Sequence, residues 1–212
     1  MLEERLLRIF VSHLAEHRRL AANIQRELLA FGVSSFVAHN DIRPTREWQD
    51  EIEAALATCD GMLALLHPGF HESKWADQEI GYAMGRQVLI VTARLGTDPY
   101  GFIGKFQSMN GIGKNAVALA EELFDILREH AMTRARIAEA VAALFCQSDS
   151  FAEARNNMRL LEQTSYWNAS LSDRVRSASE SNRQISDAVW QWTPEVTVPQ
   201  RLEEFLARME SS

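Results

Sequence analysis

Long hydrophobic runs are missing from this 212-residue sequence. No apolar stretch comes near the ~20 residues that a membrane-spanning helix needs, so we expect no membrane segment. The opening segment MLEERLLRIFVSH carries acidic residues and leads directly into a strand-like run, which argues against a signal peptide. Only two cysteines occur, Cys59 and Cys146, so the sequence predicts no disulfide framework and a reducing, cytoplasmic location.

Positive charge and glycine-rich phosphate loops are also scarce. The net charge of −7 disfavours broad nucleic-acid binding, because phosphate contacts need a basic surface. The segments GFIGKFQ and GIGKNAV lack the spacing of a dinucleotide fingerprint and the Ser or Thr that follows Lys in a P-loop. Pro68 and Gly69 separate His67 from His71, so helical zinc spacing fails and we expect no metal site.

What the sequence does contain is an alternation of strand-like and helix-like segments over its first ~130 residues. Buried strands are predicted at 6–12, 33–38, 61–66 and 88–93. Helices are predicted between them, the first ended by Gly32 and the third capped by Ser73 and ended by Gly85. This order predicts an α/β fold with a flavodoxin-like parallel sheet flanked by helices, whose ligands bind at the carboxyl ends of the strands.

After Asn115 only helical patterns occur, at 116–130, 133–145, 151–163, 170–190 and 199–209. We therefore expect two domains, an α/β domain at 1–131 and a small helical domain at 132–212. The helical domain carries no catalytic signature, and a surface for a protein partner is the alternative to simple packing.

The segment from Ser73 to Tyr82 holds the strongest chemical signal. Trp75, Glu79 and Tyr82 are spaced i, i+4, i+7 and share one helix face. A large aromatic ring one turn before a carboxylate can hold a substrate ring beside an anion. On spacing alone, a surface glutamate beside a core tryptophan is the favoured explanation of the pattern.

Three blocks together resemble a bacterial TIR (Toll/interleukin-1 receptor) domain: IFVSH at 9–13, HNDIRPTREWQDEIEAALATCD at 39–60 and SKWADQEIGYAMGRQVLIV at 73–91. The stretch GTDPYGFIGKFQSMNG at 96–111 is similar to the tail of the same subfamily. The resemblance covers about the first 115–130 residues, and the helical extension lies outside it.

The resemblance implies an enzyme that takes NAD as a substrate, without another cofactor, and acts as an NAD glycohydrolase or ADP-ribosyl cyclase in antiphage or stress signalling. The family's catalytic glutamate matches Glu79, and its companion tryptophan matches Trp75. The loop at 40–46 matches the family's mobile loop, which gates the site and builds TIR–TIR assemblies, so we expect a dilute monomer to be weakly active. Thr45 stands where many members have glycine, and threonine does not adopt a positive φ readily.

A single carboxylate suffices for this chemistry. Nicotinamide is attached to NAD as a pyridinium, so it leaves as a neutral molecule and needs no general acid. The reaction instead needs an anion that stabilises the oxocarbenium-like ribose.

Five further residues are candidates for substrate binding. Ser12 and His13 end the first strand, Asp41 and Arg43 lie in the loop that follows the second, and Trp48 begins the next helix. Each also has a plainer interpretation: a solvated strand end, solvated loop charges and a core tryptophan.

Two other functions stay open. One is a non-catalytic TIR scaffold that binds other TIR domains through the loop at 40–46. The other is an enzyme similar to nucleoside deoxyribosyltransferases, which would act on free nucleosides and not on NAD. The pairing of Trp75 with Glu79 favours the NAD-cleaving enzyme, since a scaffold needs neither residue there.

Overall fold

The computed structural model describes residues 6–37, 46–106, 108–190 and 196–211, without the side chains of 46–48. The chain forms two compact units, one spanning Leu7–Ile126 and the other containing Leu6 and the chain from Leu127 onward. The division falls within helix α4 (Ala116–Glu129). The predicted domains, 1–131 and 132–212, stay a prediction. Within the described ranges, no helix is both long enough and apolar enough to cross a membrane.

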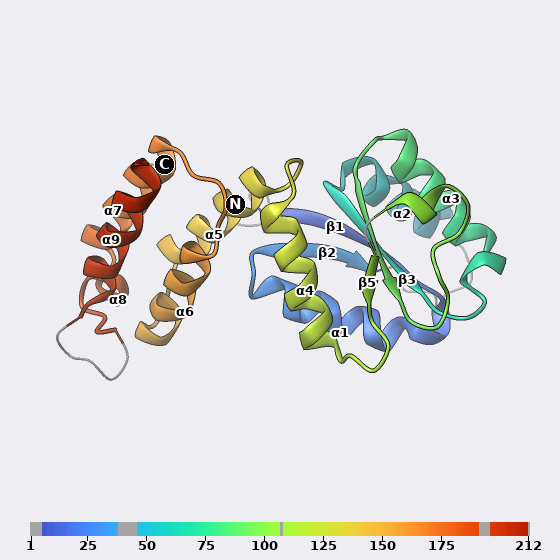
Figure 1. The fold of residues 1–212 in the computed structure, drawn as a ribbon, viewed down its shortest axis with the longest axis horizontal. Helices are drawn as coiled ribbons and strands as arrows, with labels where there is room; N and C mark the ends of the chain where they lie inside the picture. The colour runs from blue at the N-terminus through green and yellow to red at the C-terminus, as the bar shows by residue number, and fades with distance from the viewer. Residues whose placement is uncertain (1–5, 38–45, 107, 191–195, 212) are drawn as a thin grey trace. The chain divides into compact units, whose positions relative to one another are not determined.

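Parallel strands form the sheet of the first unit, in the order β2-β1-β3-β4-β5 (Figure 1). They are β1 (Leu7–Ser12), β2 (Val33–Val37), β3 (Gly61–Leu66), β4 (Leu89–Arg94) and β5 (Ser108–Asn110). The central strand β3 is buried along its whole length, as its unbroken apolar run GMLALL predicts for a strand covered on both faces. This architecture confirms the predicted α/β fold. The chain order reverses direction between β1 and β3, where such sheets bind ligands.

Helices cover both faces of the sheet. The helices α2 (Arg46–Thr58) and α3 (Lys74–Gly85) lie on one face, and α1 (Arg18–Leu29) lies on the other (Figure 1). The α2–α3 side is a hydrophobic core in which Phe10 of β1 and Leu66 of β3 meet Ile80 of α3. On the α1 side, the ring of Phe31 stacks on Phe124 of α4 at 4.6 Å between ring centres.

One local expectation in this unit is corrected. The sequence does not predict strand β5, because its three residues include only one buried side chain, Met109, and give no apolar run. Helix α3 ends at Gly85, as expected, and the left-handed residue beyond it is Gln87, at φ 57°. The cap of α3 is as predicted, with the Ser73 hydroxyl accepting a hydrogen bond from Ala76 N at 3.3 Å.

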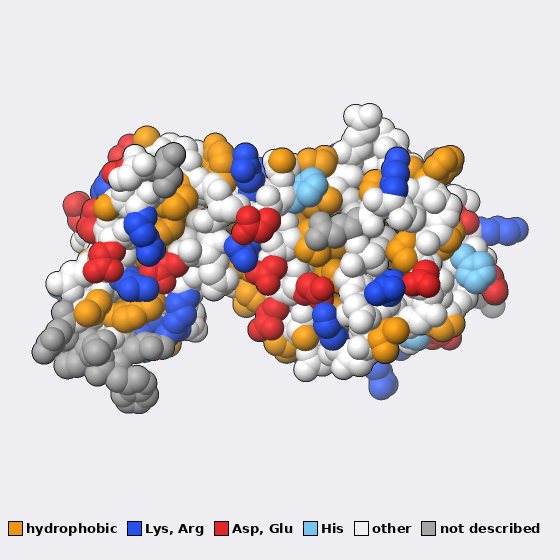
Figure 2. All heavy atoms as spheres, in the orientation of Figure 1, with side chains coloured by type: hydrophobic (Ala, Val, Ile, Leu, Met, Phe, Trp, Pro, Cys, Tyr) orange, Lys and Arg blue, Asp and Glu red, His pale blue; other side chains and the backbone are white. Residues whose placement is uncertain are grey.

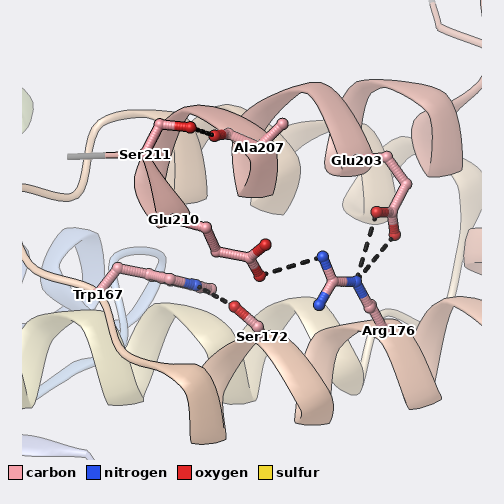
Figure 3. Close-up of polar contacts among 7 residues, drawn as sticks. All are labelled: Trp167, Ser172, Arg176, Glu203, Ala207, Glu210 and Ser211. Carbon is pink, nitrogen blue, oxygen red and sulfur yellow. Dashed lines mark hydrogen bonds and ion pairs between the residues drawn. The ribbon is translucent and has the colours of Figure 1, made fainter.

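The second unit consists of helices: α5 (Arg134–Cys146), α6 (Phe151–Glu162), α7 (Ala169–Ser181), α8 (Arg183–Ser186) and α9 (Val198–Glu210). Their shared core includes Val141, Phe145, Met158, Leu202 and Phe205, all buried. Figure 3 shows how polar contacts join α7 to α9, where Arg176 pairs with Glu203 at 3.3 Å and with Glu210 at 3.1 Å.

The expected helix at 170–190 is wrong in its length. It ends at Ser181, and the short helix α8 begins after Asn182. Asn182 has an extended backbone, and its side chain accepts a hydrogen bond from Gln184 N at 2.9 Å while donating to Ser148 O at 3.0 Å. Side chains of this type compete with helix continuation by bonding the nearby backbone.

Candidate active site

Helix α3 brings Glu79 to the edge of the hydrophobic core. Ala76, Ile80 and Ala83 pack into the α2–α3 side of the sheet, and Glu79 lies next to them on the helix surface at 8% exposure. The carboxylate is therefore held by a helix whose neighbouring side chains are fixed by packing. A rigid support of this kind keeps a reacting group in one geometry.

The partner of Glu79 comes from the last residue of β1. The Ser12 hydroxyl donates a hydrogen bond to Glu79 Oε2 at 2.6 Å, across 67 residues of sequence, and Ser12 is 1% exposed. Ser12 and Phe10 are two residues apart on β1, so strand alternation turns both toward the α2–α3 side. The sequence proposed both residues for the site, and the structure brings them into direct contact.

Burial changes the acidity of Glu79. Loss of solvation raises the pKa of its carboxyl from 4.5 to about 7, because water no longer stabilises the anion. The hydrogen bond from Ser12 opposes this rise, since it stabilises the ionised form. A carboxyl group near a strand end with a strongly shifted pKa is a common property of functional sites.

Trp75 lies one helical turn before Glu79, with 41% of its surface exposed, and Tyr82 one turn after it is 44% exposed. The three residues thus occupy one side of α3, with the carboxylate buried and the two rings open to solvent. The exposed Trp75 ring can form a platform beside the Glu79 carboxylate. The plainer interpretation, in which Trp75 is a buried core residue, does not hold.

Histidines gather at the same strand ends. His13, directly after β1, is 8% exposed, and its Nδ1 lies 3.0 Å from Val11 O, a contact in which the imidazole is the donor. His67, directly after β3, lies flat on His17, with 3.3 Å between ring centres and 13° between ring planes. Of these, the sequence singled out His13. His17 and His67 were missed because 50 residues separate them and only the pairing of β1 with β3 brings them together.

The side chains of the remaining candidates lie outside the described residues. Asp41, Arg43 and Thr45 lie outside the described residues. Trp48 belongs to α2, but its side chain is also outside the description. In the described part of the chain, no group of three or more His, Cys, Asp or Glu side chains is arranged to hold a metal ion.

A small pocket of about 230 Å³ lies between α3 and the 3-10 helix η4 (Gly101–Lys105). Its walls include Ile80, Gly81 and Phe102, and the Tyr100 hydroxyl beside it donates to Asp77 at 2.7 Å. Glu79 does not line it, because Glu79 points to a different side of α3. Over the face drawn in Figure 2, acidic and basic side chains are interspersed, without a continuous basic field.

These features define the class: an α/β protein with strand order 2-1-3-4-5 and a buried carboxylate at the carboxyl edge of its sheet. The model of one protein family, described as TIR domain, matches residues 9–124. Since this match covers more than half of the chain, the protein belongs to the TIR domain family. Among curated proteins, no match is found.

Proposed function

We propose that this TIR protein cleaves the bond between nicotinamide and ribose in NAD, with Glu79 as the catalytic carboxylate. The observation that carries the proposal is the fixed, buried position of Glu79 at the strand ends, hydrogen-bonded by Ser12. The resemblance of the Ser73–Tyr82 segment to NAD-cleaving TIR domains supplies the substrate.

The reaction needs little from the protein beyond an oriented anion. The bond between ribose C1′ and the pyridinium nitrogen breaks with both electrons going to nitrogen, so nicotinamide leaves uncharged. The ribose carries the positive charge, and the Glu79 carboxylate stabilises it. Water then adds to C1′ and releases a proton, which yields ADP-ribose. If an adenine nitrogen of the same molecule adds in its place, the product is a cyclic isomer.

The raised pKa of Glu79 couples ionisation to substrate binding. Near neutral pH, about half of the free protein has this carboxyl protonated, since its pKa is about 7. A bound nicotinamide ring brings a positive charge to the site, and an opposite charge nearby favours the ionised carboxylate. Substrate binding therefore produces the charged form that the reaction needs.

A direct test follows nicotinamide release from NAD by chromatography, with mass spectrometry to identify the product. We expect Glu79→Gln to lose a factor on the order of 10²–10³ or more in rate, the usual loss for one key electrostatic group. The matched control is Glu72→Gln, which removes a carboxylate that is 76% exposed on the neighbouring 3-10 helix η3 (Phe70–Glu72). Equal activities of the wild type and Glu79→Gln would refute the enzymatic role of Glu79.

Family membership also supports association between TIR domains, and we propose that assembly precedes full activity. A scaffold that only assembles is the competing function. It predicts that Glu79→Gln assembles like the wild type and that neither protein releases nicotinamide at any concentration.

A further inference from the structure

The pocket between α3 and η4 takes no part in the proposed chemistry, because Glu79 does not line it. Its walls are mainly apolar. Ile80 and Ile103 are buried, Met84 is half-buried, and Phe102 has 79% of its surface exposed. The pocket therefore offers an apolar surface to solvent on a side of α3 that is separate from Glu79.

The size of the pocket suits a small ring system. Its volume is about 230 Å³. An apolar cavity of roughly 150 Å³ is enough to bind benzene, so this pocket can admit a bicyclic ring. Ligand pockets typically combine such apolar walls with a few polar groups that fix the orientation of the ligand.

A single carboxylate, that of Asp77, gives the pocket its charge. The Tyr100 hydroxyl donates to Asp77 Oδ1 at 2.7 Å, so the phenol is already paired. In the described part of the chain, no other donor bonds Asp77 and no cation pairs with it, which leaves Oδ2 available as an acceptor. A carboxylate oxygen beside an apolar pocket favours a ligand with a charged N–H donor.

Gly81 is an independent indication that the space is used. It lies inside α3 with an ordinary helical backbone, where glycine is less stable than alanine. A Cβ at this position would meet no atom of the described residues within 4 Å beyond its own part of the helix, so the fold does not require glycine. Because Gly81 lines the pocket, a longer side chain there would occupy it. Glycine keeps the pocket open and lets a ligand approach the helix backbone.

We propose that this pocket binds a small ligand with a flat ring system and one positively charged nitrogen. The ring packs against Ile80 and Gly81, beside the exposed ring of Phe102, and the nitrogen donates to Asp77 Oδ2. Aromatic walls favour a flat ring through edge and stacking contacts, and they also attract a cation. The inference does not depend on the proposed function, since Glu79 is not part of the pocket.

The test compares two probes of the same shape on the full chain. Tryptamine is an indole with an ammonium group, and in tryptophol a hydroxyl replaces the ammonium. Two-dimensional NMR follows the backbone amides of Gly81 and Gly101, which both line the pocket. We expect saturable shifts at both amides. Tryptamine should bind about fivefold more tightly than tryptophol, the upper range for an ion pair at a protein surface.

Three variants separate the charge from the shape of the pocket. Asp77→Asn keeps an oxygen that accepts from Tyr100 but has no charge, so it should bind the two probes equally. The matched control is Asp98→Asn, which neutralises an exposed carboxylate paired with Arg94 outside the pocket and should keep the preference for tryptamine. Gly81→Leu should abolish binding of both probes by filling the pocket. It should unfold at no lower temperature than the wild type, because leucine favours the helix.

The proposal fails if the amides of Gly81 and Gly101 show no saturable shifts, if the wild type binds the two probes equally, or if Asp77→Asn keeps the preference. Undiminished tryptamine binding in Gly81→Leu would place the ligand elsewhere and overturn the site as well. Loss of self-association in Gly81→Leu, in a protein that binds neither probe, would assign the pocket to a second copy of the chain and overturn the small ligand. These outcomes are independent of nicotinamide release, which Glu79→Gln tests separately.

Discussion

The replacement Glu79→Gln should stabilise the TIR unit at alkaline pH while it removes activity. The pKa of Glu79 is about 7 in the folded protein against 4.5 for an exposed carboxyl. Each unit of difference corresponds to about 1.4 kcal/mol, so the ionised carboxylate costs the fold about 3 kcal/mol well above pH 7. Glutamine keeps the oxygen that accepts from Ser12 and has no charge to bury.

The raised pKa of Glu79 decides whether stability rises or falls with pH. Between pH 4.5 and 7 the folded protein binds more protons at this site than the unfolded chain does, so stability falls as pH rises. The loss begins near the unfolded pKa, 4.5, and is complete above the folded pKa, about 7. In Glu79→Gln this component is absent. Its advantage over the wild type should therefore be about 3 kcal/mol larger at pH 8.5 than at pH 4.

Hydrogen exchange of the buried β3 amides, compared between proteins at each pH, reports the free energy of unfolding of this unit separately from the helical unit. Urea denaturation gives the same difference for the whole chain. The control Glu72→Gln changes an exposed carboxylate and should follow the wild type within about 0.5 kcal/mol. If the stabilities of the wild type and Glu79→Gln change in parallel from pH 4 to 8.5, the carboxyl is not held in an environment that disfavours its charge, and the reasoning fails.

Two further predictions concern activity. The kcat/KM for nicotinamide release should rise with pH to a plateau above about 7, the pKa of Glu79. Ser12→Ala should move the midpoint of this profile upward, because it removes the hydrogen bond that lowers the Glu79 pKa, and Ser12→Thr should restore it. A pH–rate profile from 5.5 to 9 checks this, and an unchanged midpoint in Ser12→Ala would contradict it. Specific activity should increase with protein concentration in parallel with assembly measured by light scattering, and proportional activity down to nanomolar protein would show that the monomer is sufficient.

Apolar runs in the sequence predict the bounds of the buried strands closely. The strand prediction at 61–66 matches β3 fully, and those for β1 and β4 differ by one residue at their ends. Continuous apolar runs have few alternatives when both faces are covered. Strand β5 shows the limit, because a three-residue edge strand is defined by its pairing with β4, from Thr92–Ser108 to Arg94–Asn110, and not by its own composition.

Contacts between elements that are distant in the sequence are harder to predict than the elements themselves. Spacing alone predicted that Trp75 and Glu79 share a side of α3, but it did not reveal that the carboxylate is buried and the tryptophan half-exposed. The stacking of His17 on His67 has no local signal at all. The sequence places His67 directly after a buried strand, at the ligand-binding edge of the sheet, and excludes it there only as a zinc ligand.

The register of β1 decides that Ser12 and His13 point to opposite faces of the sheet. Its pairing of Ser12 with Ala64 of β3 directs Ser12 to Glu79 and leaves His13 for the opposite face. A shift of one residue would exchange the two faces, placing His13 against the carboxylate and turning Ser12 away. The buried residues Phe10 and Val11, on opposite faces of the same strand, oppose that shift because each fits a different core. The apolar packing of β1 thus holds the Ser12 hydroxyl against the Glu79 carboxylate.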